Sequence, residues 1–333
     1  MEIYWGFPFQ GKTLEKLKIF LHNQNLDYDD RVQCSVCIMD EEQIAASGSI
    51  DGNVLKCIAV SPMYQHEGLA ARIVTELITK AFQRGQYHLF IFTKPENEDM
   101  FSGLGFYTIS CTDKVLLMEN KQNGITDFVS ELKKAEGKTI GCIVANCNPF
   151  TKGHLYLIET AANQCDIVHL FILSENKSEF PTELRRELVI QGTAHIPNVI
   201  VQPTGPYLIS SATFPEYFLK DTCSQTTNGV LDLTIFAERF ARPLHITRRF
   251  VGTEPYCPTT SVYNQQMKEI LPRYGIEVVE IPRLTIPNRN SVDLQAVSAS
   301  RVRTLLKEGA LADIEALVPS VTYNYLYNYD QHK

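Results

Sequence analysis

The stretch "NCNPFTKGHLYLIE", residues 146–159, decides the fold of the second half of the chain. The apolar segment "TIGCIVAN", residues 139–146, precedes it and is typical of a buried strand. Apolar residues at helical spacing follow directly after Gly153. A chain that turns from a buried strand straight into a helix is typical of a doubly wound parallel sheet. Thr151 and His154 therefore stand at the carboxyl end of a strand, where such sheets bind their ligands.

The residue types at this turn indicate phosphate chemistry. Unpaired backbone N–H groups at a helix start attract phosphate, and a histidine or threonine side chain can donate to a phosphoryl oxygen as negative charge develops. Thr151, Gly153 and His154 thus predict a phosphate cradle with two side-chain donors. Lys152 either adds charge to it or points to solvent. The alternative is a capped helix start that carries an ordinary surface histidine.

The remainder of the second half alternates between helical and strand-like segments. We expect helices at 153–163 and 182–193 and strands at 166–173, 198–202, 248–254 and 276–283. Strands that alternate with helices predict an α/β domain whose parallel sheet is covered by helices on both faces.

Two further loops place polar residues at the same edge of this sheet. Lys177 lies in the loop after the second strand, and Arg185 lies on the helix that follows. Gly252 and Glu254 come at the end of a later strand. Because the carboxyl ends of parallel strands share one edge, we expect these residues to lie near His154.

The segment "AVSASRVRTLLKEG", residues 296–309, predicts a second anion site. Ser298 and Ser300 open a helix, with Arg301 and Arg303 in its first turn. Positive side chains there oppose the helix dipole unless an anion binds. The alternative for Arg303 is a solvated helix face.

The first half contains a second turn suited to phosphate. In "IAVSPMYQHEGLAARIV", residues 58–74, a strand ends and a helix begins around Gln65, Gly68 and Ala70. Small residues at the last two positions let the backbone approach a ligand closely.

The length of 333 residues favours two domains. We predict a mixed α/β domain at 1–122, a linker at 123–138 and the doubly wound domain at 139–333. Residues 204–230 read as a long insertion, rich in Tyr, Phe and Ser, that either covers the active site, meets a partner protein or only packs.

Composition narrows the class of protein. The formal net charge of −7 argues against free nucleic acid as a partner. We expect no signal peptide and no membrane span, since no segment approaches roughly 18 consecutive apolar residues. The nine cysteines include one C-x-x-C, Cys34 and Cys37, without the second pair that a zinc site needs. We therefore expect buried free thiols in a reducing, cytoplasmic setting and no metal site formed by protein side chains.

The second half resembles the nucleotidyltransferase superfamily with the T/H-x-G-H signature. The resemblance is carried by Asn148, Phe150, Thr151, Gly153 and His154, by Lys177, Phe180 and Arg185, and by the segment from Val297 to Arg303. Asn148 stands where that family has Asp, and Ala299 and Ser300 replace its usual Ser and Thr. The resemblance implies attack on the α-phosphorus of ATP, release of pyrophosphate and magnesium as counter-ion.

The first half resembles the GCN5-related N-acetyltransferase fold, which holds coenzyme A. Gln65, Gly68 and Ala70 match its pyrophosphate-binding turn, and "MFSGLGFYTI" matches a late segment. Phe101 occupies the position where a tyrosine often serves as general acid, and Tyr107 is placed differently. The alternative is a vestigial structural domain.

Both motif sets, in this order, resemble the citrate (pro-3S)-lyase ligase family, as do residues 209–221 and 250–272. The resemblance implies that ATP and acetate give acetyl-AMP and pyrophosphate. Acetyl then passes to the thiol of the dephospho-coenzyme A-derived prosthetic group on the acyl carrier protein of citrate lyase, which activates the lyase.

The same resemblance implies roles for individual residues. Thr151, His154 and Lys177 would be catalytic, and Gln65, Gly68 and Ala70 would hold the prosthetic group. ATP would be bound by Asn148, Phe150, Gly153, Arg185, Gly252, Glu254, Ser298, Ser300 and Arg303.

Two other functions stay open on the sequence. One is an adenylyltransferase that moves AMP from ATP onto a phosphate-bearing, pantetheine-type acceptor. The other is a non-catalytic, nucleotide-binding partner of a carrier protein. The first would ignore acetate, and the second would release no pyrophosphate.

Overall fold

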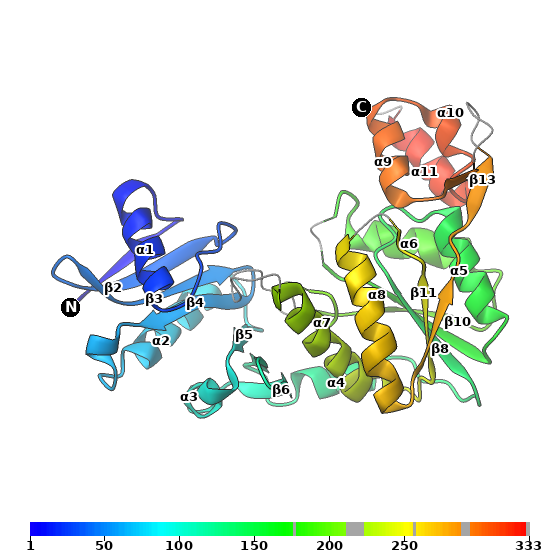
Figure 1. Cartoon of the computed structure of the whole chain (residues 1–333). Helices are drawn as coiled ribbons and strands as arrows, with labels where there is room; N and C mark the ends of the chain where they lie inside the picture. Colours follow the sequence, from blue (N-terminus) through cyan, green and yellow to red (C-terminus); the bar gives the residue numbers. More distant parts are fainter. Residues whose placement is uncertain (176–177, 211–222, 256–257, 288–293, 331–333) are drawn as a thin grey trace. The chain divides into compact units, whose positions relative to one another are not determined.

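The computed structural model describes residues 1–175, 178–210, 223–255, 258–287 and 294–330 (Figure 1). The chain forms two compact units. The first comprises residues 1–127 and 211–235, and the second comprises residues 128–210 and 236–333. The sequence predicted a contiguous division, whereas α7 (Cys223–Ile235) belongs to the first unit and packs near its strand β6 (Tyr107–Cys111).

The first unit is built on a mixed, seven-stranded sheet in the order β1-β2-β3-β4-β5-β7-β6. Its strands are β1 (Glu2–Gly6), β2 (Cys34–Asp40), β3 (Gln43–Asp51), β4 (Val54–Val60), β5 (Phe90–Thr93), β6 and β7 (Leu116–Glu119). Its other helices are α1 (Gly11–Asn23), η1 (Pro62–Tyr64), α2 (Leu69–Gln83), η2 (Pro95–Asn97), α3 (Glu98–Ser102) and the start of α4 (Gly124–Glu131). Neighbouring strands are antiparallel except β4 and β5, which are parallel.

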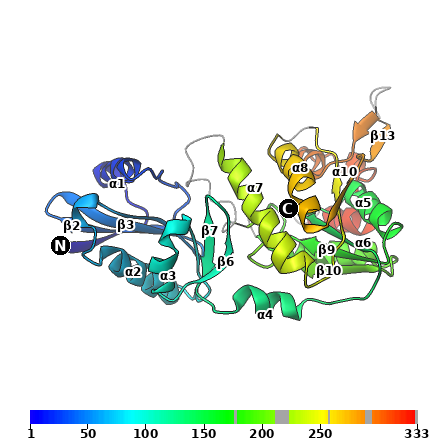
Figure 2. The ribbon, with the colours of Figure 1, turned by 60° about the horizontal axis from the view of Figure 1, so that its bottom comes forward.

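Helices α1 and α2 cover opposite faces of this sheet (Figure 2). Leu69, Ile73 and Leu77 recur at helical spacing along α2 and are buried in the core on its side. Cys34 lies in this same core, whereas Cys37 lies in the core under α1. Residues three apart on a strand face opposite sides, so the C-x-x-C pair cannot share a metal ion.

The second unit is built on a parallel sheet in the order β10-β9-β8-β11-β12. Its strands are β8 (Ile140–Ala145), β9 (Ile167–Ile172), β10 (Val199–Pro203), β11 (Arg248–Gly252) and β12 (Glu277–Ile281). A separate hairpin pairs β13 (Thr285–Pro287) with β14 (Leu294–Ala296). The strand order reverses at β8, which pairs with β9 on one side and β11 on the other, and ligands bind beside such a switch point.

Helices cover both faces of this sheet, which confirms the doubly wound fold. The helices are the rest of α4, α5 (Lys152–Ala162), α6 (Thr182–Thr193), the π-helix η3 (Phe236–Ala241), α8 (Pro258–Ile270), η4 (Leu271–Tyr274), α9 (Ala299–Lys307), α10 (Leu311–Ile314) and α11 (Ser320–Asp330). Ile158 of α5 and Leu188 of α6 share one core with Phe250 of β11. On the other face, Phe240 of η3 packs against Phe171 of β9, with ring centroids 5.8 Å apart.

The described part of the chain contains no helix that is both long and apolar enough to cross a membrane. Nor do its His, Cys, Asp and Glu side chains gather into a group of three that could hold a metal ion.

Candidate active site

The turn between β8 and α5 is held by a reciprocal cap. The Thr151 hydroxyl accepts a hydrogen bond from the backbone N–H of His154 at 3.3 Å, and His154 Nδ1 accepts one from the backbone N–H of Thr151 at 3.1 Å. Thr151 is buried, and its hydroxyl oxygen lies 2.9 Å from the same Nδ1. The cap thus fixes the imidazole ring to the helix start.

This cap determines the protonation state of His154. A ring nitrogen that accepts a hydrogen bond carries no proton, so the neutral imidazole has its proton on Nε2. Burial, together with the positive charge of Arg283, lowers the pKa of His154 to about 4. At neutral pH the residue is therefore an uncharged Nε2–H donor, which is suited to a developing phosphoryl charge.

Gly153 brings the second predicted anion segment next to this cap. A Cβ at Gly153 would lie 3.1 Å from the carbonyl oxygen of Val297, so any larger residue would push the two backbones apart by a few tenths of an ångström. Ser298 follows Val297 and caps α9, since its hydroxyl accepts from the N–H of Arg301 at 3.2 Å. Two capped helix starts thus meet at one edge of the sheet.

One pocket at this edge unites most of the predicted residues, and we call it the β8/β11 pocket. It is lined, among others, by Thr151, Gly153, His154, Gly252, Glu254, Arg283, Ser298 and Ser300. Gly252 ends β11 and has open space where a side chain would begin. The pocket therefore combines two helix starts, a neutral histidine donor and an open strand end.

Arg283 is a site residue that the sequence did not reveal. Its guanidinium pairs with the carboxylate of Glu254, and its Nε donates to the carbonyl of Thr253 at 2.7 Å. Arg283 lies just past β12, in a segment without a recognisable motif. Only the pairing of β12 with β11 brings it to His154, so no local signal could have identified it.

Arg185 differs from its predicted role as an ATP contact. It is fully buried, and its five N–H donors are directed at protein oxygens. The acceptors are Phe180 O at 3.0 Å, Asn146 O at 2.7 Å, Asn146 Oδ1 at 2.6 Å, Glu175 O at 2.9 Å and Thr182 Oγ1 at 2.8 Å. Burial lowers the pKa of Arg185. Arg185 therefore clamps the loops after β8 and β9 together and has no donor left for phosphate.

Asn148 and Arg303 form a second connection beneath the pocket. The Asn148 carbonyl accepts from Arg303 Nη1 at 2.5 Å, and its side-chain oxygen accepts from the N–H of Phe180 at 3.1 Å. Arg303 Nε also lies 3.8 Å from the carboxylate of Glu179.

Phe150 is fully buried in the core, and its ring stacks on the His154 ring at a centroid distance of 6.2 Å. This contact packs the imidazole against the core of the second unit. Lys177 lies outside the described residues.

The first unit contains a groove at the predicted turn. Strands β4 and β5 pair only at their first residues, up to Leu55 and Ile91, and separate beyond that point. The groove between them is lined, among others, by Cys57, Val60, Gln65, Gly68, Ala70 and Phe101. Helix α2 starts at this groove without a side-chain cap, which leaves its first N–H groups for a ligand.

Phe101 of this groove is buried and carries no proton to give. Tyr107 is exposed on β6, and it is not among the groove's lining residues. Tyr64 does line the groove, but its hydroxyl donates to Asp40 at 2.8 Å. Neither tyrosine is therefore placed to protonate a leaving thiolate in this groove.

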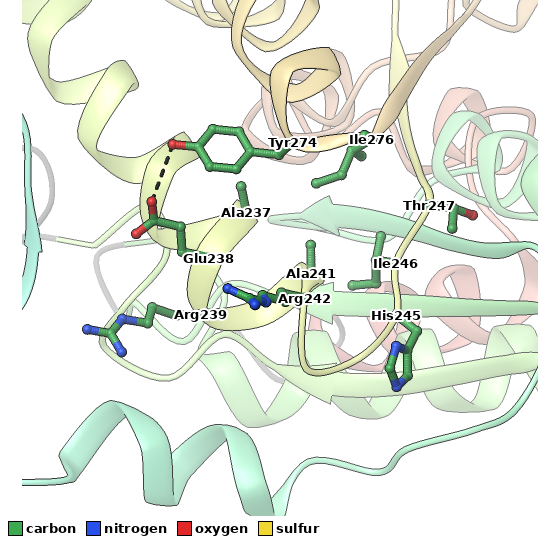
Figure 3. A pocket seen from close by; sticks show the side chains of 11 residues that line it. Ala237, Glu238, Arg239, Ala241, Arg242, His245, Ile246, Thr247, Tyr274 and Ile276 are labelled. Atoms are coloured by element: carbon green, nitrogen blue, oxygen red, sulfur yellow. Dashed lines mark hydrogen bonds between the residues drawn. The ribbon is translucent and has the colours of Figure 1, made fainter.

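A further pocket of the second unit lies at the opposite edge of the sheet (Figure 3). Thr247 and Ile276, which directly precede β11 and β12, line it, so it faces the amino ends of the strands. The Tyr274 hydroxyl donates to Glu238 across one side of it at 3.4 Å. Ligands of parallel sheets bind at carboxyl ends, so the β8/β11 pocket is the better candidate site.

Comparison with known proteins agrees with both halves of this description. The profile described as "Citrate lyase ligase C-terminal domain" matches residues 140–326, and that of the "Acetyltransferase (GNAT) family" matches residues 1–108. The chain is 43% identical to the [citrate [pro-3S]-lyase] ligase of Escherichia coli K12, over 97% of this chain and 93% of that protein. The chain belongs to the citrate lyase ligase family.

The [citrate [pro-3S]-lyase] ligase of Klebsiella pneumoniae gives the same result, with 42% identity over 94% of this chain and 92% of that protein. The resemblance to the citrate lyase ligase family is thereby confirmed, as is the pairing of an acetyltransferase-like unit with a doubly wound parallel-sheet unit.

The Arg185 clamp predicts a large stability effect. Arg185→Met should lower the free energy of unfolding by about 3 kcal/mol or more, because several buried carbonyl oxygens would lose their hydrogen-bond donor. Urea unfolding followed by circular dichroism measures this. Arg186→Met, the next residue on α6, is the control and should cost much less. Equal losses in the two variants would contradict the clamp.

The cap predicts the titration of His154. Imidazole NMR spectra, assigned with His154→Ala, should show an Nε2–H tautomer and a pKa near 4. Arg283→Gln should raise this pKa, because it removes a positive charge that lowers it. If the neutral ring is the catalytic form, the catalytic rate should stay constant as the pH falls through 6.5, the ordinary pKa of histidine. An Nδ1–H tautomer, or a pKa above 6.5, is incompatible with the cap.

Proposed function

We propose that this protein activates citrate lyase by ATP-dependent acetylation. Acetate and ATP would form acetyl-AMP in the β8/β11 pocket, and acetyl would then pass to the thiol of the dephospho-coenzyme A-derived prosthetic group on the acyl carrier protein of the lyase. The observation that carries the proposal is the neutral Nε2–H donor of His154 at a capped helix start, in a chain of the citrate lyase ligase family.

The first step is a substitution at phosphorus. A carboxylate oxygen of acetate forms a bond to the α-phosphorus of ATP, and the bond from that phosphorus to the bridging oxygen breaks. The electron pair leaves with pyrophosphate. His154 donates to an α-phosphoryl oxygen as charge develops on it, and Thr151 holds the ring in the donating tautomer.

The second step is transfer to sulfur. The thiol sulfur bonds to the acetyl carbon, the bond from that carbon to the AMP oxygen breaks, and AMP leaves with the electron pair while the thiol proton passes to solvent or base. The groove between β4 and β5 would hold the prosthetic group, with its pyrophosphate at Gln65, Gly68 and Ala70. A groove without a free tyrosine donor fits this binding role.

We assign the remaining predicted residues to two parts of the ATP site, one for adenosine and one for the triphosphate. Gly252 and Glu254 would line the adenosine site, Ser298 and Ser300 would offer the α9 start to the triphosphate, and Lys177 would supply positive charge. Arg303 of α9 would add to the positive charge near the triphosphate.

Magnesium enters the proposal as a counter-ion of the triphosphate. Mg²⁺ is usually held by substrate phosphates and only one or two carboxylates, so it needs no cluster of protein ligands. We also propose a cytoplasmic location, because Cys37, Cys142 and Cys147 are buried free thiols, and burial raises the pKa of each.

The first test removes the phosphoryl donor. His154→Ala should slow acetate-dependent pyrophosphate release by about 100-fold, as expected for the loss of one transition-state donor, while the fold persists. Hydroxylamine in the assay traps acetyl-AMP as acetyl-hydroxamate. His195→Ala is the control, since His195 is exposed and pairs only loosely with Glu159 at 3.4 Å. Near-normal release by His154→Ala would refute the role of this residue.

The same assay separates the two alternatives. A plain adenylyltransferase would release pyrophosphate only with a phosphorylated acceptor and would ignore acetate. A binding partner would release none with any acceptor, deacetylated citrate lyase included.

The second test separates the two steps. Gly68→Ala should slow acetyl transfer to the carrier protein at least about tenfold while leaving hydroxamate formation unchanged, since a Cβ there would project into the space of the ligand. Gly105→Ala is the matched control. Both glycines have a positive φ, +74° at Gly68 and +84° at Gly105, and both have open space where a Cβ would lie. Gly105 is not among the lining residues of the groove. If Gly68→Ala slowed hydroxamate formation and acetyl transfer equally, and Gly105→Ala slowed neither, the groove would not be a separate site for the thiol.

A further inference from the structure

Arg249 of β11 is a buried cation inside the β8/β11 pocket. Arg249 is among the pocket's lining residues, although only 3% of the residue is exposed. Nη1 donates to the thiol of Cys142 at 3.4 Å, and the guanidinium lies over the ring of Phe236, 4.6 Å from its centroid. Nε is buried and has no hydrogen-bond partner. Within the described ranges, no carboxylate lies within ion-pair distance of Arg249.

Two other buried cations in the described part of the chain, Lys56 and Arg185, each contact several oxygen atoms. Lys56 of the first unit contacts two carboxylates, those of Asp29 at 2.9 Å and Asp51 at 2.7 Å. Arg185 has every donor on an oxygen. A buried charge without a counter-charge is costly. A thiol and an aromatic ring offset little of that cost, so the guanidinium is poised for an anion that arrives from the pocket.

The surroundings of Arg249 suit a small anion with an apolar end. Neighbouring residues of a strand face opposite sides, so Phe250 packs towards α5 while Arg249 and Val251 face the other way. Val144, Val251 and Met267 line the same pocket and provide an apolar wall. A nucleotide phosphate has no apolar surface to bury against such a wall, whereas a short carboxylic acid can bury its methyl group there.

We propose that Arg249 binds the carboxylate of the acid substrate, a short-chain monocarboxylate, and so provides the acid subsite of the reaction. This inference rests on the proposed function. The planar guanidinium can pair with a carboxylate through two N–H groups. One carboxylate oxygen then forms the bond to the α-phosphorus, the bond to the bridging oxygen breaks with its electron pair leaving on pyrophosphate, and the other oxygen stays at the guanidinium.

The test compares Arg249→Gln and Arg249→Lys with Arg248→Gln. Arg248 is the matched control, because it is the adjacent arginine but pairs with Glu277 at 2.8 Å. Acetate-dependent pyrophosphate release is measured with acetate and ATP varied separately. In Arg249→Gln the KM for acetate should rise about 100-fold, as expected when one partner of a buried charge pair is removed, and the KM for ATP should change little. Arg249→Lys should be intermediate, and Arg248→Gln should match the parent protein.

The outcomes separate this assignment from the proposed function. If the parent protein shows no acetate-dependent release with the carrier protein present, the proposed function fails. If the parent responds and Arg249→Gln keeps its KM for acetate, or loses acetate and ATP affinity equally, only the Arg249 assignment is overturned. Thermal unfolding checks each variant. Should Arg249→Gln fail to fold, Arg249→Lys decides by the same criterion, with an unchanged KM for acetate counting against the assignment.

Discussion

The hydrogen bond from the Thr151 backbone N–H to His154 Nδ1 is the constraint on which the site depends. It selects the tautomer, fixes the ring at the start of α5 and directs the remaining donor away from the backbone. Burial and Arg283 then keep the ring neutral at physiological pH. A charged histidine would bind the phosphates of ATP before reaction as well as during it, whereas a fixed neutral donor gains most as charge develops.

The surrounding contacts maintain this geometry across segments far apart in the sequence. Arg185 joins the loops that follow β8 and β9. Arg303 of α9 holds the carbonyl of Asn148, just before the cap. Gly153 lets the Val297 backbone approach within contact distance. Each connection crosses between two strand ends or helix starts, so the pocket is preorganised by packing and not by its own loops.

Local patterns predicted the parts of the fold that local chemistry determines. The helix at 182–193 has its predicted bounds, and the strand-to-helix turn before His154 is confirmed, because apolar periodicity and capping residues act over a few positions. A capped helix start entered the sequence analysis only as the alternative to a phosphate cradle, and the structure shows that the turn is capped. The first strand and helix of the chain and the π-helix η3 were not predicted, although Leu14, Leu17 and Leu21 of that helix recur at helical spacing.

Roles set by distant contacts could not be read from the sequence. Arg185 matched a motif position, yet its donors are used within the protein, since the acceptors lie in the loops that follow β8 and β9. Arg283 and Arg249 belong to no motif, and only the sheet pairing and the faces of β11 place them in the pocket. The sequence therefore specified which strand ends form the site but not which arginines complete it.

The most direct test of the central claim follows the oxygen atoms. Acetate carrying ¹⁸O at both carboxylate positions is turned over with ATP and deacetylated citrate lyase, and the released AMP and pyrophosphate are analysed by mass spectrometry. If the carboxylate attacks the α-phosphorus and the thiol then attacks the acetyl carbon, each AMP gains one ¹⁸O from acetate and pyrophosphate gains none. Unlabelled AMP, or label in pyrophosphate, would contradict the account.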